Sequence, residues 1–583
     1  MTVRPLSILP DVIDAVAEAG RMVAEEFARP GGPRLVDHVT APIDHEIELF
    51  LRARLMALVP ARFVGEEAGI VAAEENGLCW VVDPHDGTRA FLEGKRGSAV
   101  SVALLRRGQP VLGVVYAPLS PDRGRDMIAW AEGGGITRNG AAVPIDLSRR
   151  GLTGDGVVFL NHGVWQRPVW NSLACAPARF MPLPSIAYRL ARIAVGDGIA
   201  TQTLRPVNAL DIAAGHALLM AAGGVLLAED GTPVTYNDMG ESRPSACFGG
   251  APQAVAILLG RSWRGSTETR RPPRVTLDWP RIGETPAFDR AAGSLIGLML
   301  GSSLADPDTR SSGQPSAGGE LALSLARTLT GQPAYDAQAA AAAYADWLRS
   351  GPSEADAACL GIFRAAAETA TGMTSPVSRV GDPDHLGSAA LPRVVPIGLW
   401  AGSAPEAAAA AMQDVALSHP HPLNRIAGGA LAGAIAAGIG GADPTDMARI
   451  TVELARTSDG GGPVAAALEQ ALAGVALAAD APPVLRVLQH AFRHLASGAP
   501  ADTALAAAAR AGADACAVTG ALLGCAHGRL GFPVRLVMPV LTCRPDAGLA
   551  VPAPRPDLYW PDDLIELAEA LLLSRAGRTR ESA

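Results

Sequence analysis

The 583-residue chain lacks several features that mark particular classes of protein. It has no excess of positive charge, since its formal net charge is −9 and its sequence pI is about 5.7. This balance excludes a surface that coats a nucleic acid polymer, although it leaves room for a local basic pocket. Because 49% of the residues are hydrophobic and 18% are charged, the chain is globular rather than disordered.

Secretion and membrane signals are also absent from the sequence. The seven cysteines are scattered and form no C-x-x-C pair, which predicts reduced thiols in a cytoplasmic protein. The first residues, MTVRPLSILPDVIDAV, do not combine a basic head, an apolar core and a cleavage site, so we expect no signal peptide. The Ala-rich runs near 339–345, 405–412 and 429–440 are too short or too broken to span a bilayer, so no membrane partner is expected.

The sequence divides into two regions that differ in their secondary-structure signals. The chain is long enough for each region to form a domain with its own core. The first 260 residues mix helical and strand signals, which predicts a layered α/β domain over 1–260. Helical spacing predicts helices over 8–28, 44–58, 185–195 and 209–222, and short apolar runs predict strands over 61–65, 79–83, 98–105, 110–116 and 224–228. The pair Asn139-Gly140 predicts a hairpin turn.

After residue 260 the pattern changes twice. Residues 261–284, RSWRGSTETRRPPRVTLDWPRIGE, are rich in Arg, Pro, Ser and Thr and are interpreted as a linker. A basic ligand-binding arm is the alternative interpretation of that segment. From Pro286 strand signals vanish and Ala, Leu and Gly recur with helical spacing, which predicts an all-α domain over 285–583.

One stretch, Cys79 to Lys95, carries the strongest chemical signal. Its apolar start, CWVV, predicts a buried strand, and two carboxylates, Asp83 and Asp86, stand three residues apart where that strand ends. Hard cations such as Mg²⁺ prefer carboxylate oxygens held at fixed geometry. A short helix starting at Gly87 would point its free N–H groups at an anion.

Further pieces flank this stretch in order: Thr40 to Asp44, Gly65-Glu66-Glu67, and Asn208 to Gly215. With Asp83-Pro84-His85-Asp86-Gly87-Thr88 they resemble the inositol monophosphatase superfamily, whose pattern is G-E-E, then D-P-x-D-G-T, then W-D-x-A-A-G. The resemblance covers roughly the first 260 residues. It departs at Leu210, where the family often has Trp, and in one extra residue between Thr40 and Asp44.

The resemblance implies a role for each matching residue and a cofactor of two or three Mg²⁺ ions. Glu66 and Asp83 would hold one ion together with the backbone carbonyl of His85, and Asp83, Asp86 and Asp211 would hold another. Thr88, paired with Asp44, would help deprotonate the attacking water, so Thr88, Asp44 and Glu66 are the candidate catalytic residues. The candidate substrate-binding residues are Gly87, Thr88, Arg89 and Asp211.

The physical logic holds without the resemblance. Two divalent ions cancel the charge of a phosphate dianion and lower the pKa of a bound water.

Residues 86–91 and Gly113 to Pro118 look most like the 3′(2′),5′-bisphosphate nucleotidase branch, with Arg89 in place of its Lys. We therefore expect a Mg²⁺-dependent phosphomonoesterase acting on the 3′-phosphate of an adenosine bisphosphate. A related sugar or inositol phosphate stays open, as does a homo-oligomer.

The second region resembles the ADP-ribosylglycohydrolase family. The resemblance is carried by Arg290–Gly301, Gly520–Gly524, Arg555-Pro556 and the turn Ser418-His419-Pro420-His421-Pro422. That family holds two Mg²⁺ with aspartates at three places, where this chain has Ser302, Ser316-Ala317-Gly318-Gly319, and Asp514 one position out of register. Small apolar residues do not ligate Mg²⁺.

This loss of acids predicts a non-catalytic second domain. Its role is then binding of ADP-ribose or a protein, regulation of the first domain, or oligomerisation. An active ADP-ribosyl hydrolase is the competing hypothesis.

Overall fold

The computed structural model describes residues 4–36, 40–67, 69–71, 77–305, 312–352 and 384–581. The chain divides into two compact units. The first comprises Met1–Pro273 and Leu277–Glu284, and the second comprises Arg274–Thr276 and Thr285–Ala583. Among the described residues, no helix is both long and apolar enough to cross a membrane.

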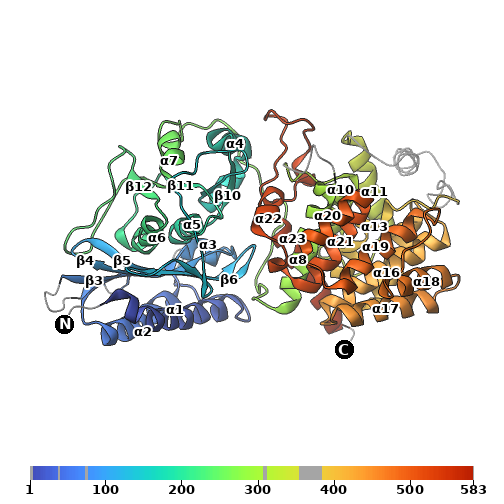
Figure 1. The fold of residues 1–583 in the computed structure, drawn as a ribbon, viewed down its shortest axis with the longest axis horizontal. Helices are drawn as coiled ribbons and strands as arrows, with labels where there is room; N and C mark the ends of the chain where they lie inside the picture. Colours follow the sequence, from blue (N-terminus) through green and yellow to red (C-terminus); the bar gives the residue numbers. More distant parts are fainter. Residues whose placement is uncertain are drawn as a thin grey trace. The chain divides into compact units, whose positions relative to one another are not determined.

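The first unit is built of alternating helical and sheet layers (Figure 1). Its larger sheet has the order β2-β1-β3-β4-β5-β6-β7-β8. The strands are β1 (Arg62–Gly65), β2 (Ile70–Val71), β3 (Leu78–Asp86), β4 (Ala99–Arg106), β5 (Gln109–Ser120), β6 (Gly124–Ala131), β7 (Thr137–Arg138) and β8 (Ala141–Ala142). Asn139 and Gly140 both have positive φ between β7 and β8, which confirms the predicted hairpin turn.

Two long helices, α1 (Pro5–Phe27) and α2 (Pro42–Leu58), cover one face of this sheet (Figure 1). Their apolar residues recur with helical spacing, so each presents one stripe to the sheet. Val12, Val16, Val23 and Phe27 of α1 are fully buried in the core beneath it. The helices α5 (Ile186–Ala194) and α6 (Ala209–Ala221) cover the opposite face.

A second sheet lies beyond α5 and α6 and has the order β10-β9-β11-β13-β12 (Figure 1). It consists of β9 (Val157–Leu160), β10 (Arg179–Pro182), β11 (Ala200–Thr203), β12 (Val225–Ala228) and β13 (Cys247–Gly250). The helices α4 (Pro168–Cys175) and α7 (Pro252–Leu259) flank it, and η1 (His162–Gln166) precedes α4. The layered α/β prediction is thus confirmed.

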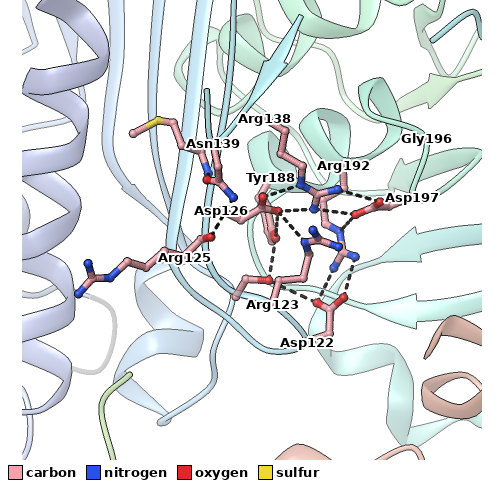
Figure 2. Close-up of polar contacts among 12 residues, drawn as sticks. Asp122, Arg123, Arg125, Asp126, Arg138, Asn139, Tyr188, Arg192, Gly196 and Asp197 are labelled. Atoms are coloured by element: carbon pink, nitrogen blue, oxygen red, sulfur yellow. Dashed lines mark hydrogen bonds and ion pairs between the residues drawn. The ribbon is translucent and has the colours of Figure 1, made fainter. Parts of the chain in front are cut away.

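A buried ionic cluster ties the two halves of the first unit together (Figure 2). The fully buried Arg192 of α5 donates to both carboxylate oxygens of Asp122, at 2.7 and 2.8 Å, and its Nε donates to Asp197 at 2.9 Å. Arg138 of β7 bonds both Asp126 and Asp197. Because every buried charge here faces opposite charges, the cluster holds its elements in register.

The second unit is helical throughout the part that the structure describes. Its helices are α8 (Pro286–Leu304), α10 (Ala317–Leu329), α11 (Ala337–Arg349), α13 (Ala390–Arg393), α14 (Val395–Trp400), α15 (Ala404–Ala416), α16 (Pro422–Ile439), α17 (Pro444–Thr457), α18 (Gly462–Leu472), α19 (Pro483–Ser497), α20 (Ala501–Ala511), α21 (Ala513–His527), α22 (Val534–Leu541) and α23 (Leu564–Glu581), with short 3₁₀ turns η3 (Arg529–Gly531) and η4 (Asp557–Tyr559). The all-α prediction is confirmed.

The helices α8 and α21 approach each other through glycines. A Cβ added at Gly297 would overlap the carbonyl oxygen of Gly520, and one added at Gly524 would overlap that of Gly293. Only residues without a side chain allow two helix backbones to come this close.

Candidate active site

The candidate site lies where β3 ends. The strand is buried between β1, which is parallel to it, and β4, which is antiparallel. In a regular strand, residues three apart point to opposite faces. The pairing with β4 shifts register between Asp83 and Asp86, and this irregularity lets both carboxylates reach the same site.

A tight turn follows the strand. Gly87 has a φ of +100°, which a residue with a side chain rarely adopts, and it caps the short helix α3 (Thr88–Leu92). The backbone N–H of His85 donates to Oδ1 of Asp83 at 2.8 Å, which fixes that carboxylate against the turn. The turn that follows the strand therefore helps to orient Asp83.

Asp211 joins the two aspartates of β3 from the first turn of α6. One carboxylate oxygen each of Asp83, Asp86 and Asp211 lies within 4.8 Å of the others. Asp211 also accepts a hydrogen bond from the backbone N–H of Asn208 at 2.6 Å. Asp86 accepts from Ser185 Oγ at 2.6 Å and from the backbone N–H of Ala187 at 2.8 Å, so each carboxylate is held by its own element.

The three carboxylates repel one another and are poorly hydrated. Burial, followed by the charges of Glu66 and Asp86, raises the pKa of Asp83 well above its usual range. Burial and the charge of Asp211 raise the pKa of Asp86 to about 7. Burial also raises the pKa of Asp211. Such a set of oxygen donors fits a hard divalent cation, whose charge would relieve this repulsion.

Glu66 follows the end of β1 at the edge of this group. Its side chain reaches solvent and is not one of the three that meet within 4.8 Å. It is nevertheless close to them, because desolvation and the charge of Asp211 raise the pKa of Glu66 to about 7. The structure thus places Glu66 beside the aspartates rather than among them.

A second group of side chains converges beside the aspartates. Thr88 Oγ1 lies 3.0 Å from Asp44 Oδ2 and 2.8 Å from the carbonyl oxygen of His85. The buried His85 ring bonds Asp44 Oδ1 through Nδ1, at 2.8 Å, and Ser98 Oγ through Nε2, at 2.9 Å. Because a carboxylate only accepts, Nδ1 donates to Asp44.

The histidine thereby orients Asp44. Sequence reasoning assigned His85 only a backbone carbonyl and did not identify Ser98 or Ser185. No local pattern singles out these two serines.

A cleft of about 680 Å³ opens beside Asp86 and Gly87. Arg89 lines it, with its side chain largely exposed and its Nε 3.2 Å from Glu93 Oε1. The volume lies within the range of about 300–1,000 Å³ that is usual for small-molecule sites. The carboxylate group therefore borders a space that a small metabolite fits.

Comparison with known proteins agrees with this geometry. The family model described as Inositol monophosphatase family matches residues 9–249, and the one described as ADP-ribosylglycohydrolase matches residues 284–581. An inositol-1-monophosphatase of Mesorhizobium japonicum is 32% identical over 240 residues, which are 39% of this chain and 86% of that protein.

The chain belongs to the inositol monophosphatase family through its first unit and to the ADP-ribosylglycohydrolase family through its second. The first unit is a metal-dependent phosphoric monoester hydrolase, as members of the inositol monophosphatase family are.

Two further relatives of the inositol monophosphatase unit carry two different names. An inositol-1-monophosphatase of Rhizobium meliloti is 31% identical over 234 residues, or 37% of this chain and 84% of that protein. The 3′(2′),5′-bisphosphate nucleotidase CysQ of Aggregatibacter actinomycetemcomitans is 25% identical over 253 residues, or 41% of this chain and 90% of that protein. Membership of the family therefore leaves the substrate open.

In the ADP-ribosylglycohydrolase unit, the three stretches that stand where that family has aspartates lie together. Ser302 Oγ is 2.7 Å from Ser316 Oγ and accepts a hydrogen bond from the Ser316 backbone N–H at 2.9 Å. A Cβ added at Gly318 would come 3.7 Å from Asp514 Oδ1. Asp514 itself accepts from Ser388 Oγ at 2.7 Å. Hydroxyls and glycines thus surround one aspartate.

Proposed function

We propose that the inositol monophosphatase unit hydrolyses a small phosphomonoester with two or three Mg²⁺ ions. The observation that carries this proposal is the convergence of Asp83, Asp86 and Asp211 beside the Thr88–Asp44 pair. In this proposal Asp83, Asp86 and Asp211 hold metal, and Glu66 and the carbonyl oxygen of His85 complete the ligands. Bound Mg²⁺ would neutralise the phosphate and activate a water.

The chain's own residues then position the reactants. Thr88 Oγ1 lies 3.0 Å from Asp44, so as Oγ1 takes a proton from the attacking water its own proton passes to the Asp44 carboxylate, which ends as the carboxylic acid. His85 keeps Asp44 in place for this transfer. The backbone N–H groups of Gly87 and Thr88 at the turn bind phosphate oxygens, and Arg89 stands at the cleft as a further phosphate partner.

We propose that the substrate is an adenosine bisphosphate that loses its 3′-phosphate, or a related sugar or inositol phosphate. A phosphate-release assay of the full chain with Mg²⁺ tests this. The panel contains adenosine 3′,5′-bisphosphate, inositol 1-phosphate, sugar phosphates and ADP-ribose phosphates. We expect metal-dependent release from at least one of them. No release from any compound, in a preparation that binds Mg²⁺, would refute the proposal.

For the ADP-ribosylglycohydrolase unit we propose a non-catalytic role. The hydroxyl pair Ser302–Ser316 supports this, because two neutral hydroxyls with one aspartate nearby are a poor site for a pair of Mg²⁺ ions. Incubation of the full chain with ADP-ribosyl-arginine and Mg²⁺ is expected to release no ADP-ribose. Metal-dependent release would reverse this assignment.

A further inference from the structure

One wall of the cleft beside Asp86 comes from outside the region that the inositol monophosphatase model matches. The match ends at residue 249, but Trp263, Arg264, Ser266 and Arg270 all line the cleft. These residues lie in the segment that the sequence presents as a linker or a basic arm. We call residues 261–271 the wall segment.

The wall segment is fastened to the first unit at several points. Arg261 donates to the carbonyl oxygen of Ala174 at 2.6 Å, and the Trp263 indole N–H donates to that of Leu258 at 2.8 Å. The Glu268 carboxylate accepts from the backbone N–H groups of Val169 and Trp170 at the start of α4. These contacts fix the course of the wall segment along the first unit.

Arginines outnumber carboxylates in the lining of the cleft. Five arginines line it, against the two carboxylates of Asp86 and Glu93; they are Arg89, Arg167, Arg205, Arg264 and Arg270. Arg89 pairs with Glu93, and Arg264 lies 3.2 Å from Glu229. Among the described residues, no carboxylate lies within ion-pair distance of Arg167, Arg205 or Arg270. An anionic ligand would supply the missing partner charge.

Arg167 gives independent support for a ligand here. Its Nε is buried and has no hydrogen-bond partner among the described residues. A buried guanidinium N–H without a partner is costly. Because Arg167 also lines the cleft, an anion bound there would offset part of this cost through the same guanidinium. Two indoles, of Trp170 and Trp263, line the same cleft and add aromatic surface on which a planar ring would stack.

We infer that the wall segment, with Arg167 and Arg205, forms a second anion subsite. The substrate of the first unit would then be a phosphomonoester that carries a second phosphate and a planar ring, not a single-phosphate polyol. This inference rests on the proposed function and deepens it. In it, Arg264 and Arg270 determine specificity, because they bind the phosphate that is not cleaved and leave the reacting phosphate to the aspartate site.

Two substrates that differ by one phosphate test the subsite. Adenosine 3′,5′-bisphosphate and adenosine 3′-monophosphate are assayed with the wild-type full chain and with Arg264→Ala/Arg270→Ala. Loss of two charge-assisted contacts should raise KM for the bisphosphate roughly tenfold or more and leave kcat nearly unchanged. KM for the monophosphate should stay the same. Arg149→Ala is the matched control, because Arg149 is exposed and neither belongs to the wall segment nor lines the cleft.

The outcomes separate this inference from the proposed function. An equal rise of KM for both substrates, or no rise for either, would overturn the subsite while the phosphatase stands. If the wild-type chain hydrolyses nothing, the proposed function fails, and the subsite is then tested by calorimetry with adenosine 5′-monophosphate. Binding that the double variant loses would support the subsite, and absence of binding to the wild-type chain would overturn it.

Discussion

The Thr88 hydroxyl lies 3.0 Å from Asp44, although 43 residues separate them in sequence. Thr88→Val keeps the shape of the side chain and removes the hydroxyl. Because the proposed proton path then loses its first acceptor, we expect kcat to fall by roughly 10²–10⁴-fold with little change in KM. Steady-state phosphate release measures both constants. Thr137→Val, in a strand remote from the aspartates, should keep full activity, and a Thr88→Val enzyme with normal kcat would contradict the role.

Asp83→Asn removes one of the three clustered charges. Activity should fall more than roughly a hundredfold because a proposed metal ligand is lost. Without metal at pH 8, however, the variant should melt at a higher temperature than the wild type, since burial and repulsion by Glu66 and Asp86 destabilise the ionised Asp83. Thermal melts with and without Mg²⁺ test this. Asp238→Asn, at an exposed position, is the control.

The pH dependence of metal activation follows from the raised pKa values. Glu66 and Asp86 each have a pKa of about 7 in the metal-free site. Protons compete with metal for the same oxygens, so the Mg²⁺ concentration for half-maximal activity should rise as pH falls below 7, roughly tenfold per pH unit for each competing proton. Mg²⁺ titrations at pH 6 and pH 8 measure it. Equal midpoints at both values would show that these carboxylates do not bind the ion.

The same shifts affect the metal-free fold in a defined direction. A carboxylate whose folded pKa is raised favours folding fully only below its unfolded pKa, near 4, and loses that contribution as pH rises through the folded value. The metal-free first unit should therefore lose stability between about pH 4 and pH 7, and Mg²⁺ should restore it at the upper end. Urea unfolding across this range, with and without EDTA, tests the sign.

Arg192→Met tests the buried ionic cluster of Figure 2. The variant leaves Asp122 and Asp197 without their central partner, which should cost about 3–5 kcal/mol of unfolding free energy. Burial would raise the pKa of Asp197, but Arg192 and Arg138 together hold it at about 2. The contribution of Asp197 is therefore present above pH 4 and lost as pH falls toward 2. Arg21→Ala, in an exposed pair with Glu18, should change the unfolding free energy far less.

Gly297→Ala tests the close crossing of α8 and α21. A methyl group would overlap the Gly520 carbonyl, so the helices must separate, at a cost of about 1–3 kcal/mol or more. Gly462→Ala is the control, because nothing lies within 4 Å of the added carbon there. Thermal unfolding of the full chain compares the two. Equal melting temperatures would mean that α8 and α21 can move apart at this position without a loss of stability.

Some parts of the fold can be predicted from the sequence and others cannot. The strand β3 and the turn after it depend on local sequence. An apolar run, two carboxylates and a glycine specify them within about ten residues. Asp83 and Asp86 were predicted to share a site from this stretch alone. The strands β9, β10, β11 and β13 were not predicted, because each has only four residues. The sequences RFMP, ATQT and CFGG of the last three also form no apolar run.

The support of the site was harder to predict than the site itself. The bond between His85 and Asp44 joins residues 41 positions apart, and Ser185 reaches Asp86 from a separate helix. Such contacts depend on tertiary packing, and a single histidine or serine has no pattern to mark it. The segment that forms the cleft wall could be interpreted as a linker or as a basic ligand-binding arm for the same reason. The positions of arginines along a sequence do not show whether their side chains face a cleft or solvent.

The anchoring of Glu268 on α4 has a practical consequence for dissecting this chain. Expression of the phosphatase half alone would be designed from the family boundary at residue 249, yet that cut discards the carboxylate that accepts from two backbone amides of α4 and the indole beside Phe248. A truncated enzyme of this kind would keep the aspartates of the candidate active site but lack the wall segment, so its substrate preference would differ from that of the full chain.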